Sequence, residues 1–276
     1  MQTKVIMKKA IYYLIVYSAL QLAAFIFPGA VIIGGIMVAT GCDFRPAVEQ
    51  SLVWILLVEY LFVSWLFLKK KWAYLNWGRI LHQERLLVVF MSVILIIALW
   101  FLIDCAMAPF LKEDVNTLET DSFPTYVIVA ECVLTLIIPL AEELLFRGAM
   151  LRAIYIRHHN IVLAIIVSAA LFGVTHWDFY QGIGAFITGI ILGWMYYQTG
   201  SLIPGIIIHT ANNIISSTWG LTYGHDTKAV DLFPNSFLYV LFIILMAFVF
   251  FLCCFFFHHK YKHSKDTWPS WYKQFF

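Results

Sequence analysis

Residues 126–148 read YVIVAECVLTLIIPLAEELLFRG, an apolar run that ends in two adjacent carboxylates and an arginine. The charged residues at that end are Glu142, Glu143 and Arg147. A charge within the hydrocarbon of a bilayer costs about 3 kcal/mol or more, so ionisable residues there usually serve a function. This stretch therefore predicts both a membrane-spanning helix and a candidate site.

The composition of the whole chain supports a membrane protein. Of its 276 residues, 62% are hydrophobic and 12% are charged, whereas soluble domains carry roughly 25% charged residues. We predict one membrane domain over residues 1–276, with no room for a large soluble domain and no role in binding nucleic acid. The five cysteines form no CxxC pair, which favours buried free thiols over a disulfide framework or a zinc knot.

Eight segments are apolar enough to be candidate spans, for which about 20 residues are needed. The fold class that we predict is all-α, a polytopic bundle of about eight transmembrane helices around an intramembrane polar cavity. The candidate catalytic core is helices four to seven, over residues 125–218. The eight segments are 11–39, 51–68, 86–103, 125–146, 161–176, 182–198, 201–218 and 236–257.

The distribution of lysine and arginine predicts the orientation. These residues gather before residue 10, between residues 69 and 85, between 152 and 157, and after 259, whereas the loop 104–124 is acidic. Positive charge stays in the cytoplasm, so we expect a multi-pass protein of the cell membrane with both termini cytoplasmic. Residues 258–276 would form a basic cytoplasmic tail. The first apolar run is too long for a cleaved signal peptide and predicts a retained helix.

Helix geometry separates the two adjacent acids. Residues four apart share a helix face, so Glu143 and Arg147 can pair, whereas Glu142 points about 100° away. The functional interpretation is that Glu142 does the chemistry while Arg147 holds Glu143. The alternative is a structural ion pair with a spare carboxylate.

Counting along the helices predicts that polar groups from three spans lie at one depth. The turn between spans four and five centres near His159, and Glu142 and His176 each lie 17 residues from it, about 25 Å along their helices. His209 and Asn213 share a face of span seven. They reach the same depth if the hairpin 147–160 protrudes roughly 10 Å into the cytoplasm. The alternatives are a packing histidine and an interhelical hydrogen-bonding pair.

Such a group of residues suits hydrolysis. A carboxylate beside imidazoles can deprotonate water as a general base, and a histidine or asparagine can donate to a developing oxyanion. One carboxylate with two imidazoles could also ligate Zn²⁺, through Glu142, His176 and His209. These residues indicate attack of water on an amide carbonyl. Two further acids, Glu59 and Glu131, are interpreted as neutral or water-facing carboxyls.

The three motifs, in this order on successive apolar segments, resemble the CPBP family. These are the CAAX-protease and bacteriocin-processing intramembrane endopeptidases, also called the Abi family, and the resemblance spans roughly residues 125–218. The motifs are Glu142-Glu143-x-x-x-Arg147, Phe172-x-x-x-His176 and His209-x-x-x-Asn213.

The resemblance implies a role for each motif residue. Glu142 would activate the water, His176 would assist, and His209 and Asn213 would stabilise the oxyanion or position the substrate. The supporting residues would be Glu143, Arg147 and Phe172. The family is often described as metalloproteases, although the part played by a metal is disputed, so both a Zn²⁺ enzyme and a metal-free enzyme stay open.

The predicted activity is hydrolysis of a peptide bond near the C-terminus of a membrane-associated protein or peptide. Eukaryotic family members cut the last three residues from prenylated CaaX proteins, and many bacterial relatives are linked to peptide maturation or bacteriocin immunity. Two alternatives are kept. One is a non-catalytic immunity or scaffold protein of the same fold. The other is a proton-coupled transporter, which predicts inverted repeats that the sequence does not show.

Overall fold

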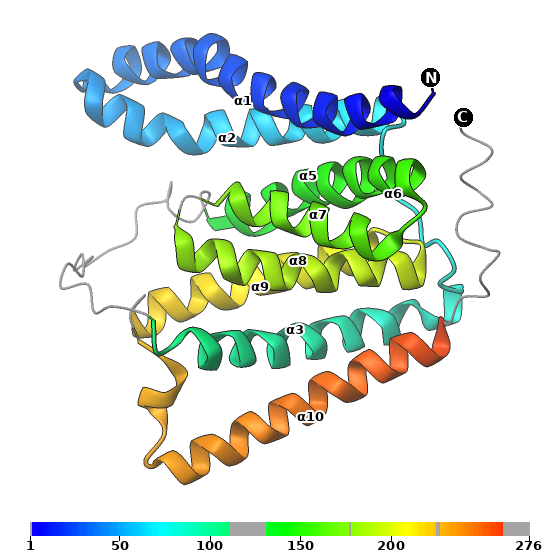
Figure 1. The fold of residues 1–276 in the computed structure, drawn as a ribbon. Coiled ribbons are helices and arrows are strands. Elements are labelled where there is room, and N and C mark those ends of the chain that lie inside the picture. The colour runs from blue at the N-terminus through cyan, green and yellow to red at the C-terminus, as the bar shows by residue number, and fades with distance from the viewer. Residues whose placement is uncertain (1, 111–130, 177, 225–226, 262–276) are drawn as a thin grey trace. The chain divides into compact units, whose positions relative to one another are not determined.

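The computed structural model describes residues 2–110, 131–176, 178–224 and 227–261 (Figure 1). Its elements are all helical, and no strand occurs among these residues, which confirms the all-α fold class. The chain divides into two compact units, which are described separately below. Unit 1 comprises Met1–Tyr74 and Leu118–His159, and unit 2 comprises Leu75–Thr117 and Asn160–Phe276. The single domain over residues 1–276 stays a prediction.

Unit 1 is built on a hairpin of two long helices. In Figure 1, α1 and α2 lie side by side, joined by a short turn in which Gly41 takes a left-handed φ of 69°. The segment that carries Glu142 packs on this hairpin through both helices. The elements are α1 (Gln2–Thr40), α2 (Phe44–Lys69), η2 (Val133–Ile137), α5 (Ile138–Glu143), η3 (Leu144–Leu151) and α6 (Arg152–His158).

The helix that carries the acidic motif is not a regular α-helix. Val133–Ile137 and Leu144–Leu151 are π-helical, and the N–H of Ile138 donates to the carbonyl of Val133, five residues before it. Pro139 follows the first π segment; a proline donates no hydrogen bond, and its ring clashes with the carbonyl four residues earlier. The wider turn relieves that clash. The irregularity caused by Pro139 is thus a π-helical turn before it.

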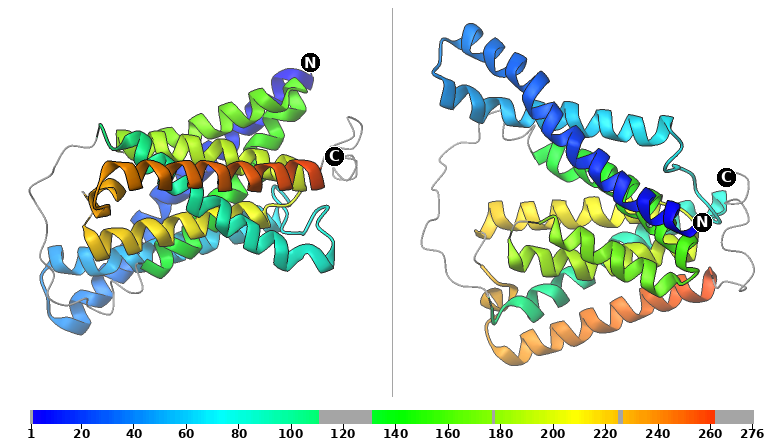
Figure 2. Two further views of the ribbon diagram at one scale, coloured as in Figure 1. Left: turned by 90° about the horizontal axis from the view of Figure 1, so that it is seen from below. Right: turned by 45° about the horizontal axis from the view of Figure 1, so that its top comes forward.

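Unit 2 is organised around α3, which packs against α8, α9 and α10. Leu95 and Leu99 of α3 share a core cluster with Leu192 and Ile208. Figures 1 and 2 show α10 lying along α3, while α7 and α8 form a hairpin. The elements are η1 (His82–Glu84), α3 (Arg85–Met107), α7 (Ile161–Val174), α8 (Phe179–Thr199), α9 (Ile203–Tyr223), η4 (Ala229–Leu232) and α10 (Ser236–Lys260).

Arg79 closes the C-terminal end of α8. Its Nη2 donates to the carbonyls of Tyr197 and Gln198 at 3.0 and 2.6 Å, and its backbone N–H donates to the carbonyl of Thr199 at 2.9 Å. Burial lowers the pKa of the Arg79 guanidinium. A cation at a helix C-terminus satisfies carbonyls that the helix leaves without partners. These hydrogen bonds fix the turn between α8 and α9. His209 lies on α9.

Gly173 and Gly182 allow α7 and α8 to approach closely. A Cβ at Gly173 would meet the carbonyl oxygen of Gly182 at 2.7 Å and the Cβ of Phe186 at 3.1 Å. We therefore expect Gly173→Ala to lower the free energy of unfolding by about 1–3 kcal/mol. The matched control is Gly184→Ala on α8, where the new Cβ would meet only Ile103 Cγ2 at 3.6 Å.

Thermal unfolding of both variants in detergent tests this expectation. The control should be neutral or slightly stabilising, because alanine favours a helix by up to about 1 kcal/mol over glycine. Equal unfolding temperatures for the two variants would show that the helices do not pack closely at Gly173.

The structure supports a multi-pass membrane protein. Among the residues that the structure describes, five helical segments are long and apolar enough to cross a membrane, namely Ile11–Thr40, Gln50–Lys69, His82–Met107, Phe179–Thr199 and Ser236–Lys260. They correspond to five of the eight predicted spans. Of the other three, 161–176 is a shorter apolar helix, Ile161–Val174, and 201–218 corresponds to α9. The span 125–146 begins outside the described residues.

Two smaller predictions are corrected or lie beyond the described chain. All five cysteines are free, as expected, but Cys132 is exposed and not buried. Its position on the helix before the π segment leaves its side chain outside the packing of unit 1. The predicted tail 258–276 is helical up to Lys260, and from residue 262 onward it lies outside the described residues.

Candidate active site

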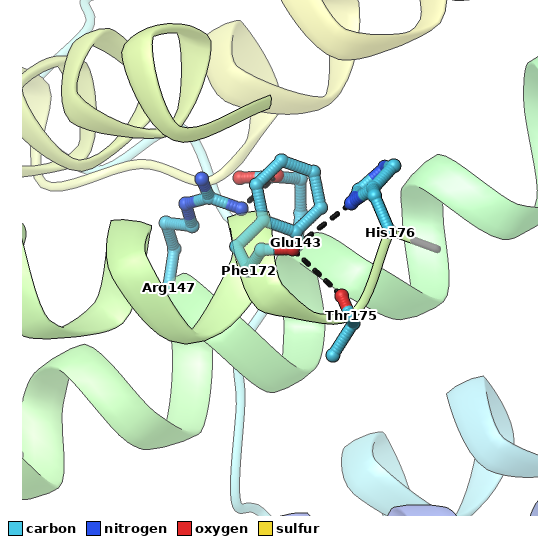
Figure 3. A network of polar contacts seen from close by, with 5 residues as sticks. All are labelled: Glu143, Arg147, Phe172, Thr175 and His176. Carbon is cyan, nitrogen blue, oxygen red and sulfur yellow. Dashed lines mark hydrogen bonds and ion pairs between the residues drawn. The ribbon is translucent and has the colours of Figure 1, made fainter. Parts of the chain in front are cut away.

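The buried ion pair of the first motif is present as predicted. Arg147 Nη1 donates to Glu143 Oε1 at 2.8 Å, and both side chains have 0% exposure (Figure 3). Glu142, next to this pair, is only half-buried. Arg147 also interacts electrostatically with Glu142, less strongly than with Glu143, so Glu142 is not wholly independent of the arginine. The two neighbouring acids therefore differ in exposure, and Glu143 forms the 2.8 Å ion pair with Arg147.

His176 lies just beyond the end of α7. The helix ends at Val174, two residues before the predicted boundary of the span 161–176. At this end, the carbonyl oxygen of Phe172 makes hydrogen bonds with side chains. Thr175 Oγ1 donates to that oxygen at 2.7 Å, and His176 Nδ1 lies 2.9 Å from it (Figure 3). A carbonyl only accepts, so this contact assigns the hydrogen of the neutral ring to Nδ1. Nε2 then presents a lone pair, as a base or ligand requires.

Phe172 brings the two imidazoles of unit 2 to one place. Its ring centroid lies 4.9 Å from that of His176 and 5.3 Å from that of His209, with interplanar angles of 85° and 80°. His209 lies on α9 and is 4% exposed. The phenyl ring of the second motif thus joins the end of α7 to the buried histidine of the third motif.

Asn213 lies one helical turn after His209 on α9 and is half-buried. The neighbouring Asn212 donates from its Nδ2 to Asn213 Oδ1 at 3.4 Å. A neighbouring amide can reach across because both side chains are short and flexible. The contact turns the Asn213 oxygen towards Asn212, which directs its NH₂ group to the other side as a donor.

The candidate residues come from both units. Glu142, Glu143 and Arg147 belong to unit 1, whereas His176 and His209 belong to unit 2. The convergence of the acid on the imidazoles, and the polar cavity around them, therefore stay predictions. Within the described part of the chain, no three His, Cys, Asp or Glu side chains form a group that could hold a metal ion.

The sequence did not indicate that two tyrosines lie near Glu142. Tyr17 of α1 and Tyr60 of α2 are both buried, and both interact electrostatically with Glu142. A tyrosine in an apolar span resembles the aromatic residues of a membrane interface, so composition gave no signal. The electrostatic interaction of Tyr60 with Glu142 follows only from the packing of α2 against α5.

Comparison with known proteins agrees with the motifs. Residues 124–215 match the family described as type II CAAX prenyl endopeptidase Rce1-like. Over this segment, about a third of the chain, the protein is similar to the Rce1-like family. The segment contains all three motifs and confirms the resemblance drawn from the sequence. At the level of the family, the match supports a CAAX-type intramembrane protease. No curated protein and no solved structure matches the chain.

Proposed function

We propose that this chain hydrolyses a peptide bond near the C-terminus of a membrane-associated protein or peptide, with Glu142 as the general base. The observation that carries the proposal is the contrast between the two acids. Glu143 is fully buried with Arg147, whereas Glu142 is half-buried and better placed to meet water. A base must reach the proton that it abstracts.

The reaction would follow the chemistry of these side chains. The Glu142 carboxylate takes a proton from water as the water oxygen bonds to the scissile carbonyl carbon. The carbonyl oxygen becomes an oxyanion, which donors from His209 and Asn213 would stabilise. The C–N bond then breaks, and the proton passes from Glu142 to the departing amine. His176 would assist by accepting a hydrogen bond from the water at Nε2.

A metal is not needed to write these steps. Glu142, His176 and His209 are donor types that suit Zn²⁺, and they would be the ligands if the enzyme holds one. A bound zinc would polarise the water and lower its pKa. The steps above use only the side chains of the protein itself.

The family gives the substrate class for this proposal. Rce1-like proteins are described as CAAX prenyl endopeptidases, and we propose a membrane-associated CaaX-type peptide as the substrate. The positive-inside pattern of the sequence favours cytoplasmic termini and a location in the cell membrane. The substrate would then be cut close to the cytoplasmic side.

Purified protein and a panel of C-terminal peptides, with and without a prenyl group, test the proposal. Wild type should cleave at least one CaaX peptide, while Glu142→Ala and His176→Ala should each lose cleavage by about 10²-fold or more. Equal cleavage by all three proteins would rule out the proposed mechanism. If Glu142→Gln preserved the biological phenotype, the chain would instead be a non-catalytic immunity or scaffold protein.

A further inference from the structure

The polar face of α9 continues beyond His209 and Asn213. Successive residues of an α-helix turn by about 100°, so Ser216 lies only about 20° from His209 around the helix. Ile208 and Ile215 point to another side, into the apolar core of unit 2. A polar side chain within a membrane helix usually faces the bundle interior or a water-filled cavity. Ser216 therefore belongs to the same face as the two candidate site residues.

The hydroxyl of Ser216 is held in place but keeps a hydrogen to donate. Trp100 Nε1 on α3 donates to Ser216 Oγ at 2.9 Å, and Ser216 is exposed. In a helix, a serine hydroxyl can instead donate to the carbonyl four residues earlier. Ser216 makes no such bond to Asn212, and its hydrogen has no acceptor among the residues that the structure describes. Ser216 is thus an oriented donor available to a ligand.

Two indole rings lie beside this hydroxyl. The rings of Trp100 and Trp219 have centroids 4.9 Å apart at an interplanar angle of 50°, and both side chains are half-buried. Their N–H groups are already engaged, since Trp100 donates to Ser216 and Trp219 Nε1 donates to the carbonyl of Thr227 at 2.7 Å. The pair still offers apolar ring surface, which suits an aliphatic side chain.

The distance along α9 suits a short extended peptide. Ser216 lies seven residues after His209, which is about 10 Å of helix. An extended chain advances about 3.3 Å per residue, so three residues cover the same length. A CaaX sequence has three residues after its cysteine, two of them aliphatic. If the scissile carbonyl lies at His209, the residues after the cleaved bond can follow α9 as far as Ser216.

We propose that the face of α9 from His209 to Ser216 binds the three residues that follow the cleaved bond. Ser216, oriented by Trp100, donates its hydrogen to a backbone carbonyl of these residues, and the indoles of Trp100 and Trp219 pack against an aliphatic side chain. All of these protein residues belong to unit 2. Trp100, Ser216 and Trp219 lie outside the segment 124–215 that the family match covers. The inference rests on the proposed function.

A pair of peptides tests this proposal. The probes are farnesylated CaaX-type peptides that end either three residues or one residue after the cleaved bond. Ser216→Ala should lower kcat/KM for the longer peptide by about fivefold, the effect of one lost hydrogen bond. It should cleave the shorter peptide as wild type does, because that peptide cannot reach position 216. Trp100→Phe, which removes the donor to Ser216 but keeps an aromatic ring, should lose less, and again only with the longer peptide.

The released tripeptide gives a second readout. It should inhibit wild type competitively, and its inhibition constant should be about fivefold higher in Ser216→Ala. An unchanged inhibition constant would overturn the inference, as would an equal loss of kcat/KM for the two peptides.

Thr218→Val is the matched control. Thr218 lies two residues after Ser216, on the opposite side of α9, and is also exposed. Removing its hydroxyl should change neither kcat/KM nor the inhibition constant. If this variant loses as much as Ser216→Ala, or if Ser216→Ala loses activity only in proportion to a lower unfolding temperature, the proposed subsite is wrong.

The same assays separate this inference from the proposed function. If Glu142→Ala is inactive while Ser216→Ala matches wild type in every assay, only the subsite fails. If Glu142→Ala cleaves as well as wild type, the role of Glu142 fails, yet the dependence of Ser216→Ala on peptide length still decides the subsite. If wild type cleaves no CaaX peptide, both fail.

Discussion

Replacing Glu142 by glutamine is expected to lower kcat by about 10³-fold without loss of stability. Glutamine keeps the size of the side chain but cannot take a proton from water, and general-base catalysis typically contributes 10²–10⁴-fold. The side chain is half-buried, whereas that of Glu143 is fully buried, so losing the charge should disturb the packing little. Cleavage kinetics give kcat, and thermal unfolding of the same purified protein gives its unfolding temperature.

The adjacent acid supplies the control. Glu143→Gln leaves the fully buried guanidinium of Arg147 without its carboxylate, so it should lower the unfolding temperature, and its loss of activity should follow the loss of folded protein. If the two variants behaved alike, with both stable and inactive or both unstable, the division of labour between the acids would be wrong.

Arg147→Ala is expected to give the largest loss of stability, about 3–5 kcal/mol. The substitution removes a side chain with 0% exposure and leaves the Glu143 carboxylate buried without its cation. It also leaves a cavity where the aliphatic stem packed. The free energy of unfolding in detergent, determined by denaturant titration, measures the effect.

A double variant distinguishes charge from packing. Glu143→Gln together with Arg147→Met removes both charges and keeps most of the volume, so it should recover more than half of the lost stability. If the double variant is as unstable as Arg147→Ala, the ion pair contributes little and the cavity dominates.

Local rules predicted the features that depend on short spacing. The pairing of Glu143 with Arg147 follows from positions four apart on a helix, and the structure has it at 2.8 Å. The turn expected near His159 is present, since α6 ends at His158, His159 is left-handed and α7 starts at Ile161. Asp178 directly precedes α8 and caps it by accepting from Gln181 N at 2.7 Å.

Features that depend on packing could not be predicted. Most residues of 133–151 are apolar, so no periodicity distinguishes a π-helical turn from an α-helical one. A π segment has more residues per turn, which shortens its rise per residue, so the 25 Å estimated from Glu142 to the turn is an upper value. The end of α7 before His176 depends on the capping of one carbonyl.

The contact of Phe172 with both imidazoles and the electrostatic relation of Tyr60 to Glu142 join residues far apart in the sequence. Such relations arise from the tertiary fold alone. The motif residues were nonetheless found from the sequence, because charged and polar side chains are conspicuous against apolar helices.

The central claim is that Glu142 meets His176 and His209, and cysteine cross-linking tests it most directly. The experiment uses native membranes and a cysteine-free background. One cysteine replaces Glu142 and a second replaces either His176 or His209, and a short bismaleimide is then applied. Both pairs should link. A cysteine at Val174, which is 81% exposed two residues before His176, should link poorly to position 142. Failure of both histidine positions to link, or equal linking of position 174, would contradict the account.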